Sequence, residues 1–249
     1  MTITKLEKLI SKRIGQAIFK YKMIEPGDKI LMAVSGGKDS MTLLYDLIKR
    51  RKSFPVPYEI LAVHIKTDFC QCCKNSDMER KFEEWGVEYR IIPVPVLERV
   101  QSGKKMNCYW CSTQRRLELM KVAEAEHCTK IALGHHLDDI IETLFMNICY
   151  NAEISTMLPR FRYRKFPYTV IRPLALVSEA QIIKFAEFKN ITRLICKCPY
   201  GRNSKRLDIR NAIKKIAARD PAVRLNIYRS MSNVNLEYLV DDKLRSSIP

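Results

Sequence analysis

The sequence predicts an α/β fold: a Rossmann-like parallel sheet flanked by helices, with a helical extension at each end. Short apolar runs alternate along the chain with segments whose apolar residues recur at helical spacing. A glycine-rich loop stands between one of these runs and the helical segment that follows it. The 249 residues, 47% of them hydrophobic, suffice for one sizeable domain with an appendage or for two small domains.

The elements follow in order from these patterns. A basic amphipathic helix is expected over residues 4–24, and Pro26 ends it. Strands are expected over residues 29–34, 59–65, 87–94, 129–133 and 168–171. Helices are expected from Met41 onward and over residues 78–85, 113–126, 138–149 and 179–188. We therefore divide the chain into an N-terminal basic helix (1–25), a central α/β domain that carries a CxxC segment (26–195) and a C-terminal basic helical segment (196–249).

The charge of the chain points to nucleic acid as a partner. Lys and Arg total 44 against 27 Asp and Glu, a net charge of +17. Nine of the basic residues fall within residues 202–229, where apolar side chains at helical spacing predict that the first half is a docked helix. We interpret this segment as a surface for phosphates, although a solvated basic face of an ordinary enzyme fits the composition as well.

The cysteines and the N-terminus bear on location. No run of apolar residues is long enough for a membrane helix, and the first residues lack the apolar core of a signal peptide, so we expect a cytoplasmic protein. Nine cysteines in such a chain indicate metal, cluster or redox chemistry rather than a disulfide framework. Cys128 and Cys149 stand in apolar surroundings and receive no function. The cluster Cys70, Cys72 and Cys73 is read either as loop thiols or as an accessory sulfur relay.

The glycine loop Ser35-Gly36-Gly37-Lys38-Asp39-Ser40 is the strongest motif. Its glycines let backbone amides approach an anion, the start of the next helix is positive, and Lys38 adds a full charge. Asp39 would repel a phosphate unless it helps to hold Mg²⁺ or orients the loop. The motif is neither a GxxxxGK[ST] loop nor a GxGxxG loop, and it resembles the pyrophosphate (PP) loop of ATP-dependent adenylating enzymes.

A second candidate segment, Gly134-His135-His136-Leu137-Asp138-Asp139, stands at a later strand-to-helix turn. Ligands of open α/β sheets collect beyond the carboxyl ends of the strands, so this segment is expected beside the loop. Its histidines and acids suit Mg²⁺ and a nucleotide. Asp138 and Asp139 point in different directions on a helix, and Asp138 is a candidate helix cap.

Cysteines supply the third motif. Cys108-Tyr109-Trp110-Cys111 has the spacing with which two thiolates bind one metal or cluster, and Cys198 follows 87 residues later. A disulfide switch, half a zinc site and half a cluster site all fit this spacing. Three thiolates would leave one coordination position open for chemistry, and Cys196 is either a fourth ligand or a packed residue.

In this order the motifs resemble those of the tRNA 2-thiocytidine synthetases, members of the PP-loop ATPase superfamily, from about residue 10 to about residue 235. The most specific segments are 35–40, 108–111, 132–147 and 171–174. The related tRNA 2-thiouridine enzymes share the loop and the cysteines, and Gly201 stands where the thiocytidine enzymes have a further cysteine. The resemblance implies ATP, Mg²⁺ and a [4Fe-4S] cluster held by Cys108, Cys111 and Cys198. The nucleotide-binding residues that it implies are Ala33, Val34, Ser35, Gly36, Gly37, Lys38, Asp39, Ser40, His64, Ile65, Gly134, His135 and Asp139.

The expected function is an ATP-dependent tRNA sulfurtransferase that adenylates a pyrimidine C2 carbonyl and replaces its oxygen with sulfur, making 2-thiocytidine in the anticodon loop. The expected partners are tRNA and a sulfur donor, either sulfide or a cysteine desulfurase system, and the N-terminal helix allows a homodimer. The expected catalytic residues are Lys38, Asp39, Asp139, Cys108, Cys111 and Cys198. The alternatives are a tRNA 2-thiouridine synthetase, a lysidine-type adenylating enzyme without thiolation, and a tRNA-binding module with a degenerate ATP site.

Overall fold

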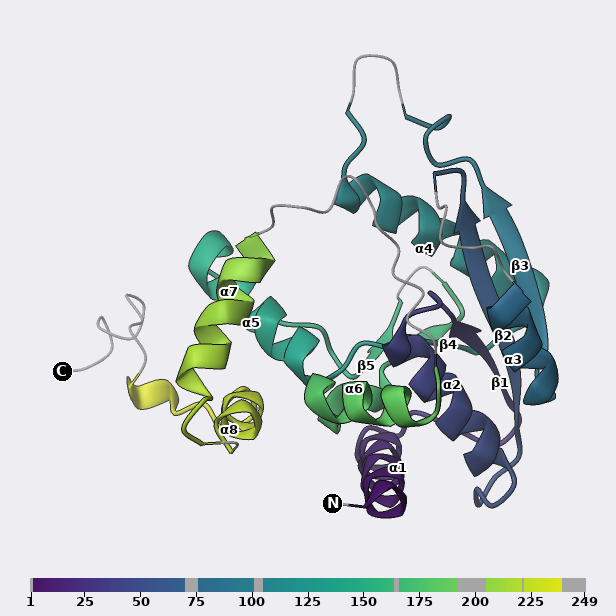
Figure 1. Cartoon of the computed structure of the whole chain (residues 1–249). Helices are drawn as coiled ribbons and strands as arrows, with labels where there is room; N and C mark the ends of the chain where they lie inside the picture. Colours follow the sequence, from purple (N-terminus) through teal and green to yellow (C-terminus); the bar gives the residue numbers. More distant parts are fainter. Residues whose placement is uncertain are drawn as a thin grey trace.

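The chain forms one six-stranded sheet with the strand order β3-β2-β1-β4-β6-β5 (Figure 1). A computed structural model describes residues 2–69, 76–100, 105–163, 166–191, 205–220 and 222–238. The strands are β1 (Asp28–Ala33), β2 (Tyr58–Thr67), β3 (Glu88–Val94), β4 (Lys130–Ala132), β5 (Arg160–Arg162) and β6 (Thr169–Ile171). All neighbouring strands pair in parallel except β5, which runs antiparallel to β6 at the edge. The α/β class is confirmed, with β5 as an addition that makes the sheet mixed.

The helices follow the predicted alternation. They are α1 (Ile3–Lys20), α2 (Lys38–Arg51), α3 (Ser76–Glu84), α4 (Cys108–Ala125), α5 (Leu137–Asn151), α6 (Glu179–Phe188), α7 (Lys205–Ile216) and α8 (Val223–Ser230), with 3₁₀ turns η1 (Pro173–Leu176) and η2 (Leu236–Tyr238). The predicted start of α4 at residue 113 is wrong. The helix begins at Cys108 because the Asn107 side chain accepts a hydrogen bond from Trp110 N at 2.9 Å and caps it.

One face of the sheet is covered by α1, α2, α3 and α6. Strand side chains alternate between the two faces, so Ile30 and Met32 of β1 point into this layer. The buried stripe of α1, which includes Ile14 and Ile18, packs into the same cluster as α2 and α6. The N-terminal helix is therefore part of the main core, and the division at residue 25 stays a prediction.

The second face is covered by α4. Leu31, Val63 and Ile131 point to this side and pack with Met120 and Ala123 of the helix. Between these layers the sheet is buried on both faces, which accounts for the almost uninterrupted apolar residues of β1 and β2.

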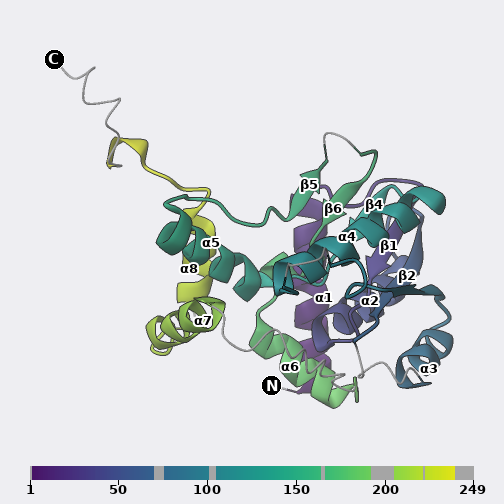
Figure 2. The same ribbon diagram turned by 90° about the horizontal axis from the view of Figure 1, so that it is seen from above.

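A third cluster joins α5 to the two C-terminal helices. Ile140 and Ile141 of α5 form one buried cluster with Ile209 and Ile213 of α7 and Tyr228 of α8. Figures 1 and 2 show these helices to one side of the sheet, with α7 and α8 against α5. The prediction of a docked helix in the basic C-terminal segment is confirmed, and its docking partner is α5.

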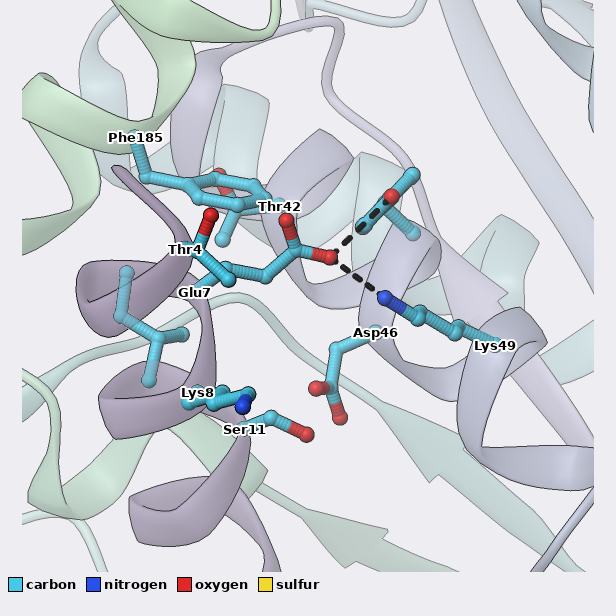
Figure 3. Close-up of a pocket in the computed structure, with 10 residues that line it drawn as sticks. Thr4, Glu7, Lys8, Ser11, Thr42, Asp46, Lys49 and Phe185 are labelled. Atoms are coloured by element: carbon cyan, nitrogen blue, oxygen red, sulfur yellow. Dashed lines mark hydrogen bonds and ion pairs between the residues drawn. The ribbon is translucent and has the colours of Figure 1, made fainter. Parts of the chain in front are cut away.

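A cavity of about 200 Å³ lies between α1, α2 and α6 (Figure 3). Glu7 reaches across it and accepts hydrogen bonds from Lys49 Nζ at 2.6 Å and from Tyr45 Oη at 3.3 Å. None of the predicted site residues lines this cavity. No helix in the described part of the chain combines the length and the apolarity that a bilayer crossing demands.

Candidate functional site

The site lies where the strand order reverses direction. The chain leaves β1 through α2 to β2 on one side, while β4 pairs with β1 on the other side. The loops after β1 and β4 therefore diverge at the carboxyl edge of the sheet and leave room between them for a ligand. Ser35–Ser40 follows β1 and Gly134–Asp139 follows β4, so the structure brings the two predicted nucleotide segments together.

The loop after β1 presents backbone amides to this space. Gly36 has a φ of 78°, a left-handed conformation that favours glycine. Ser40 Oγ accepts a hydrogen bond from Ser35 N at 3.1 Å and donates to Gly37 O at 3.0 Å, which ties the loop to the first turn of α2. Among the described residues, no acceptor meets the backbone N–H groups of Lys38, Asp39 and Ser40. Three aligned donors at the positive end of α2 suit the phosphates of a nucleotide.

Gly134 brings the second segment against the first. A Cβ atom on Gly134 would lie 2.9 Å from Ser40 N and 3.0 Å from Ser40 Cα, closer than side-chain and backbone atoms can approach. Only glycine lets the loop after β4 touch the start of α2. This contact fixes the distance between the two segments.

Lys38 is held by two carboxylates. Its Nζ donates to Asp39 Oδ2 at 3.2 Å and to Glu179 Oε1, at the start of α6, at 3.0 Å. The Lys38 side chain is only 13% exposed, so these contacts lie in a partly desolvated space. Burial works against ionisation of Glu179, but the hydrogen bond from Lys38 and the charges of Lys38 and Arg210 hold the pKa of this carboxyl below its ordinary value.

Asp39 and Asp139 both lie next to the ring of His136. His136 is the N-cap of α5: its Nδ1 accepts from Asp139 N at 3.3 Å, and its own backbone N–H donates to Asp139 Oδ2 at 3.1 Å. Asp39 Oδ1 is buried and accepts no hydrogen bond of good geometry from the described residues, although Lys38 Nζ lies 3.1 Å away. Two carboxylates beside one histidine, one of them with an unsatisfied oxygen, offer the kind of oxygen ligand that Mg²⁺ prefers.

Asp138 has a different role from the helix cap considered above. It accepts a hydrogen bond from Glu179 N at 2.7 Å through Oδ2, and Arg224 Nε donates to its Oδ1 at 2.8 Å. His136 takes the capping position because its backbone is extended and its ring reaches the first turn. The expectation that Asp138 and Asp139 act separately agrees with this arrangement.

Burial lowers the pKa of two further histidines. His64 is buried and donates from Nδ1 to Val34 O at 2.8 Å, and burial lowers its pKa. Burial lowers the pKa of His135 to about 4, and the charge of Arg172 acts in the same direction. Arg172 Nε donates to His135 Nδ1 at 3.4 Å, and burial lowers the pKa of Arg172 to about 10. His135 therefore offers a neutral ring at the carboxyl edge of the sheet.

Cys108 and Cys111 lie in the first turn of α4. Cys111 packs against the same core cluster as Ala33, the last residue of β1. Arg115, four residues further on the same face of the helix, acts electrostatically on His64 beneath the loop. The cysteine helix therefore begins at the edge of the sheet where the nucleotide loop lies. Two thiols at this spacing beside the positive end of a helix fit an anionic iron–sulfur cluster.

The third expected ligand, Cys198, lies outside the described residues. The same holds for Cys196 and for the cluster Cys70, Cys72 and Cys73. Within the described ranges, no three His, Cys, Asp or Glu side chains are arranged to hold a metal ion. The three-cysteine ligand set stays a prediction.

Several C-terminal arginines are engaged with acids of α5. Arg210 Nε donates to Glu142 Oε1 at 2.6 Å, and Arg206 Nη1 lies 3.6 Å from Asp139 Oδ1. Sequence reasoning treated these residues with the others as a surface for phosphates. The sequence analysis also missed Glu179. The available signal was the capping pattern that follows Ile171-Arg172-Pro173-Leu174. We did not assign Glu179 to the site because an acid in the first turn of a helix normally stabilises only that helix.

Comparisons with known proteins identify the family of this chain. Residues 4–216 match the model of a family described as the PP-loop domain. A tRNA-cytidine(32) 2-sulfurtransferase of Francisella tularensis subsp. tularensis is 36% identical over 250 residues, which cover 98% of this chain and 92% of the relative. The tRNA-cytidine(32) 2-sulfurtransferase of Xylella fastidiosa is 37% identical over 244 residues, 96% of this chain and 81% of the relative.

A solved structure supports the fold. The U34-tRNA thiolase NcsA from Methanococcus maripaludis, determined with its [4Fe-4S] cluster, superposes with a TM-score of 0.77 and 23% identity, covering 94% of this chain and 80% of the other. The resemblance drawn from the sequence is confirmed: the chain belongs to the PP-loop ATPase superfamily and, within it, to the family of the tRNA-cytidine 2-sulfurtransferases.

Proposed function

We propose that this protein is an ATP-dependent tRNA sulfurtransferase that converts a cytidine of tRNA to 2-thiocytidine. The observation that carries the proposal is that α4, with Cys108 and Cys111, begins at the carboxyl edge of the sheet where the loop of Lys38 lies. The relatives from Francisella tularensis and Xylella fastidiosa are named for cytidine 32, and we take position 32 of the anticodon loop as the target. With tRNA as the substrate, we expect the protein to act in the cytoplasm.

The first step activates the pyrimidine. A carbonyl oxygen leaves poorly, whereas the same oxygen bonded to the phosphorus of AMP leaves as AMP. The C2 oxygen attacks the α-phosphorus of ATP, the bond to the β-phosphate breaks, and pyrophosphate departs. Lys38 and the three free amides at the start of α2 stabilise the charge on that leaving group.

Two bound groups would complete the site. Asp39 and Asp139 would hold Mg²⁺, which neutralises phosphate charge. Cys108 and Cys111, with Cys198 as the proposed third ligand, would hold a [4Fe-4S] cluster, which supplies the sulfur-transfer chemistry. In the second step, hydrosulfide from the donor attacks C2, the bond from C2 to the adenylated oxygen breaks, AMP leaves and the sulfur proton is released.

The remaining basic side chains would hold the RNA backbone. Lys214, Lys215, Arg219 and Arg229 are exposed and form no ion pair with described residues. Exposed lysines of α1 would extend this surface, which suits an unstacked loop base presented to the site. The homodimer through α1 stays a prediction.

Mass analysis of tRNA nucleosides from cells with and without this protein tests the function. We expect 2-thiocytidine to disappear when the protein is removed. Loss of a 2-thiouridine instead would assign the chain to the uridine branch. Unchanged thiolated nucleosides would overturn the proposal.

The purified protein separates thiolation from the remaining alternatives. Protein prepared without oxygen should contain iron and acid-labile sulfide and should release pyrophosphate when ATP and tRNA are present. Pyrophosphate release without iron would indicate a lysidine-type enzyme. Binding of tRNA with no pyrophosphate release would indicate an RNA-binding module.

A further inference from the structure

Glu179 contacts the nucleotide loop from a helix 141 residues away in the sequence. Its Oε1 lies 3.0 Å from Lys38 Nζ, and both side chains are largely buried. Asp39 is the other partner of Lys38, but it is next to Lys38 in the chain and is a proposed magnesium ligand. Glu179 is thus the partner that links Lys38 to another element, the start of α6.

The start of α6 is itself held from α5 and α8. Glu179 N donates to Asp138 Oδ2 at 2.7 Å, so the first turn of α6 is tied to the first turn of α5. The other oxygen of Asp138 accepts from Arg224 Nε at 2.8 Å. Asp138 is about one-seventh exposed and Arg224 one-quarter exposed, so solvent only partly screens this pair. A continuous series of contacts runs from Arg224 through Asp138 and Glu179 to Lys38.

This series borders a cavity of about 580 Å³ between α5, α6, α7 and α8. Asp138, Glu179 and Arg224 all line it, together with Arg210 and Lys214 of α7. The helices that carry the basic C-terminal segment are therefore connected to the nucleotide loop through the contacts of Arg224, Asp138 and Glu179, which line this cavity.

We propose that Glu179 is a positioning residue for Lys38, and that Asp138 couples that positioning to Arg224 on α8. The inference rests on the proposed function, in which Lys38 stabilises pyrophosphate and α7 and α8 lie beside the RNA. Glu179 holds the lysine in the direction that the leaving group needs. Its negative charge also repels the phosphates of ATP, so removing that charge should not weaken the binding of ATP.

The substitution Glu179→Gln tests the first part, because glutamine keeps the size and removes the charge. We expect kcat for pyrophosphate release to fall about tenfold, while KM for ATP stays the same or falls. Glu179→Asp should recover part of the lost rate. Glu187→Gln, at an exposed position of the same helix, should match the unsubstituted protein.

A merely structural role would give a different result. A loosened loop would raise KM for ATP and lower the melting temperature together with kcat. That pattern, or a kcat unchanged by Glu179→Gln, would overturn the assignment of Glu179 as a positioning residue.

The combination with Arg224→Gln tests the coupling. We expect Arg224→Gln alone to lower kcat about threefold, and the double variant to lose about tenfold, no more than Glu179→Gln alone. Independent effects would multiply to about thirtyfold and would overturn the link through Asp138.

Calorimetric titration of MgATP without tRNA distinguishes failure of this inference from failure of the proposed function. Glu179→Gln should bind MgATP at least as tightly as the unsubstituted protein. If that holds while no tRNA is thiolated, the proposed function fails and the contact of Glu179 with Lys38 keeps its role in nucleotide binding. If tRNA is thiolated and MgATP binds more weakly to Glu179→Gln, the inference fails alone.

Discussion

His136 Nε2 lies 3.8 Å from Asp39 Oδ1, while the opposite side of its ring caps the helix that carries Asp139. One buried imidazole thus lies within 4 Å of both carboxylates. Carboxylate oxygens are the ligands that Mg²⁺ prefers, and we propose that these two bind it. Their contribution is therefore measurable as a dependence on magnesium.

Asp39→Asn and Asp139→Asn should each raise the magnesium concentration for half-maximal pyrophosphate release about tenfold or more, because each removes a charged oxygen from the cation. Titration of MgCl₂ at saturating ATP measures this shift. Asp208→Asn, at an exposed position of α7, is the matched control and should not change it. An unaltered magnesium dependence in both variants would remove these residues from the metal site.

Lys38→Ala should lower the rate of pyrophosphate release by at least about 100-fold, because a charge aimed at the leaving group is lost. The affinity for tRNA should change little, since Lys38 is buried beside Glu179 and not on the basic surface. Quenched-flow assays and filter binding give the two quantities. A Lys38→Ala protein with a normal rate would exclude the lysine from the mechanism.

Gly134→Ala should weaken ATP binding and destabilise the fold, because its Cβ would meet backbone atoms of Ser40 at 2.9–3.0 Å. Gly27→Ala is the matched control: its φ of 77° is strained for alanine, but its Cβ would have open space. That control should cost about 1 kcal/mol of unfolding free energy and leave ATP affinity unchanged. Equal ATP affinities in the two variants would show that the contact with Ser40 has no bearing on the nucleotide.

Cys108→Ala and Cys111→Ala should each lose iron and acid-labile sulfide, because two thiolates cannot retain a cluster that three hold. Cys149→Ala, an exposed cysteine on α5, should keep both. Iron and sulfide analysis after purification without oxygen measures the content. Retention of a full cluster by either of the first two variants would contradict the proposed ligand set.

His135→Asn should flatten the dependence of stability on pH between about 6.5 and 4. Above pH 6.5 the ring is neutral in both the folded and the unfolded states. Below it, the unfolded ring takes up a proton while the folded ring, with its pKa near 4, does not, so acid lowers the free energy of unfolding. Between these pH values the histidine lowers the free energy of unfolding by up to about 3 kcal/mol. Asparagine does not titrate and so causes no such loss, while it can still accept a hydrogen bond from Arg172. Urea denaturation at several pH values measures it, and parallel pH curves for the two proteins would contradict the lowered pKa.

The parts of the site that the sequence could predict are short, contiguous sequence motifs. Ser35–Ser40 and Gly134–Asp139 each stand in one short segment, and the hydrophobic periods on either side place them at strand ends. The pairing of Lys38 with Glu179 and of Arg224 with Asp138 could not be predicted, because it depends on how α6 and α8 dock. Strand β5 was missed because its three residues include Arg160 and Arg162, which belong to no strand pattern and are tolerated only at an edge.

The position of α1 has a consequence for how the chain reaches this fold in the cell. The helix leaves the ribosome before η1 and α6, on which its apolar stripe packs and which are synthesised about 150 residues later. At ordinary rates of translation the stripe stays unshielded for about 10 s or more. Contacts between such distant parts of the chain are entropically costly and form slowly. We therefore expect α1 to bind a chaperone during synthesis.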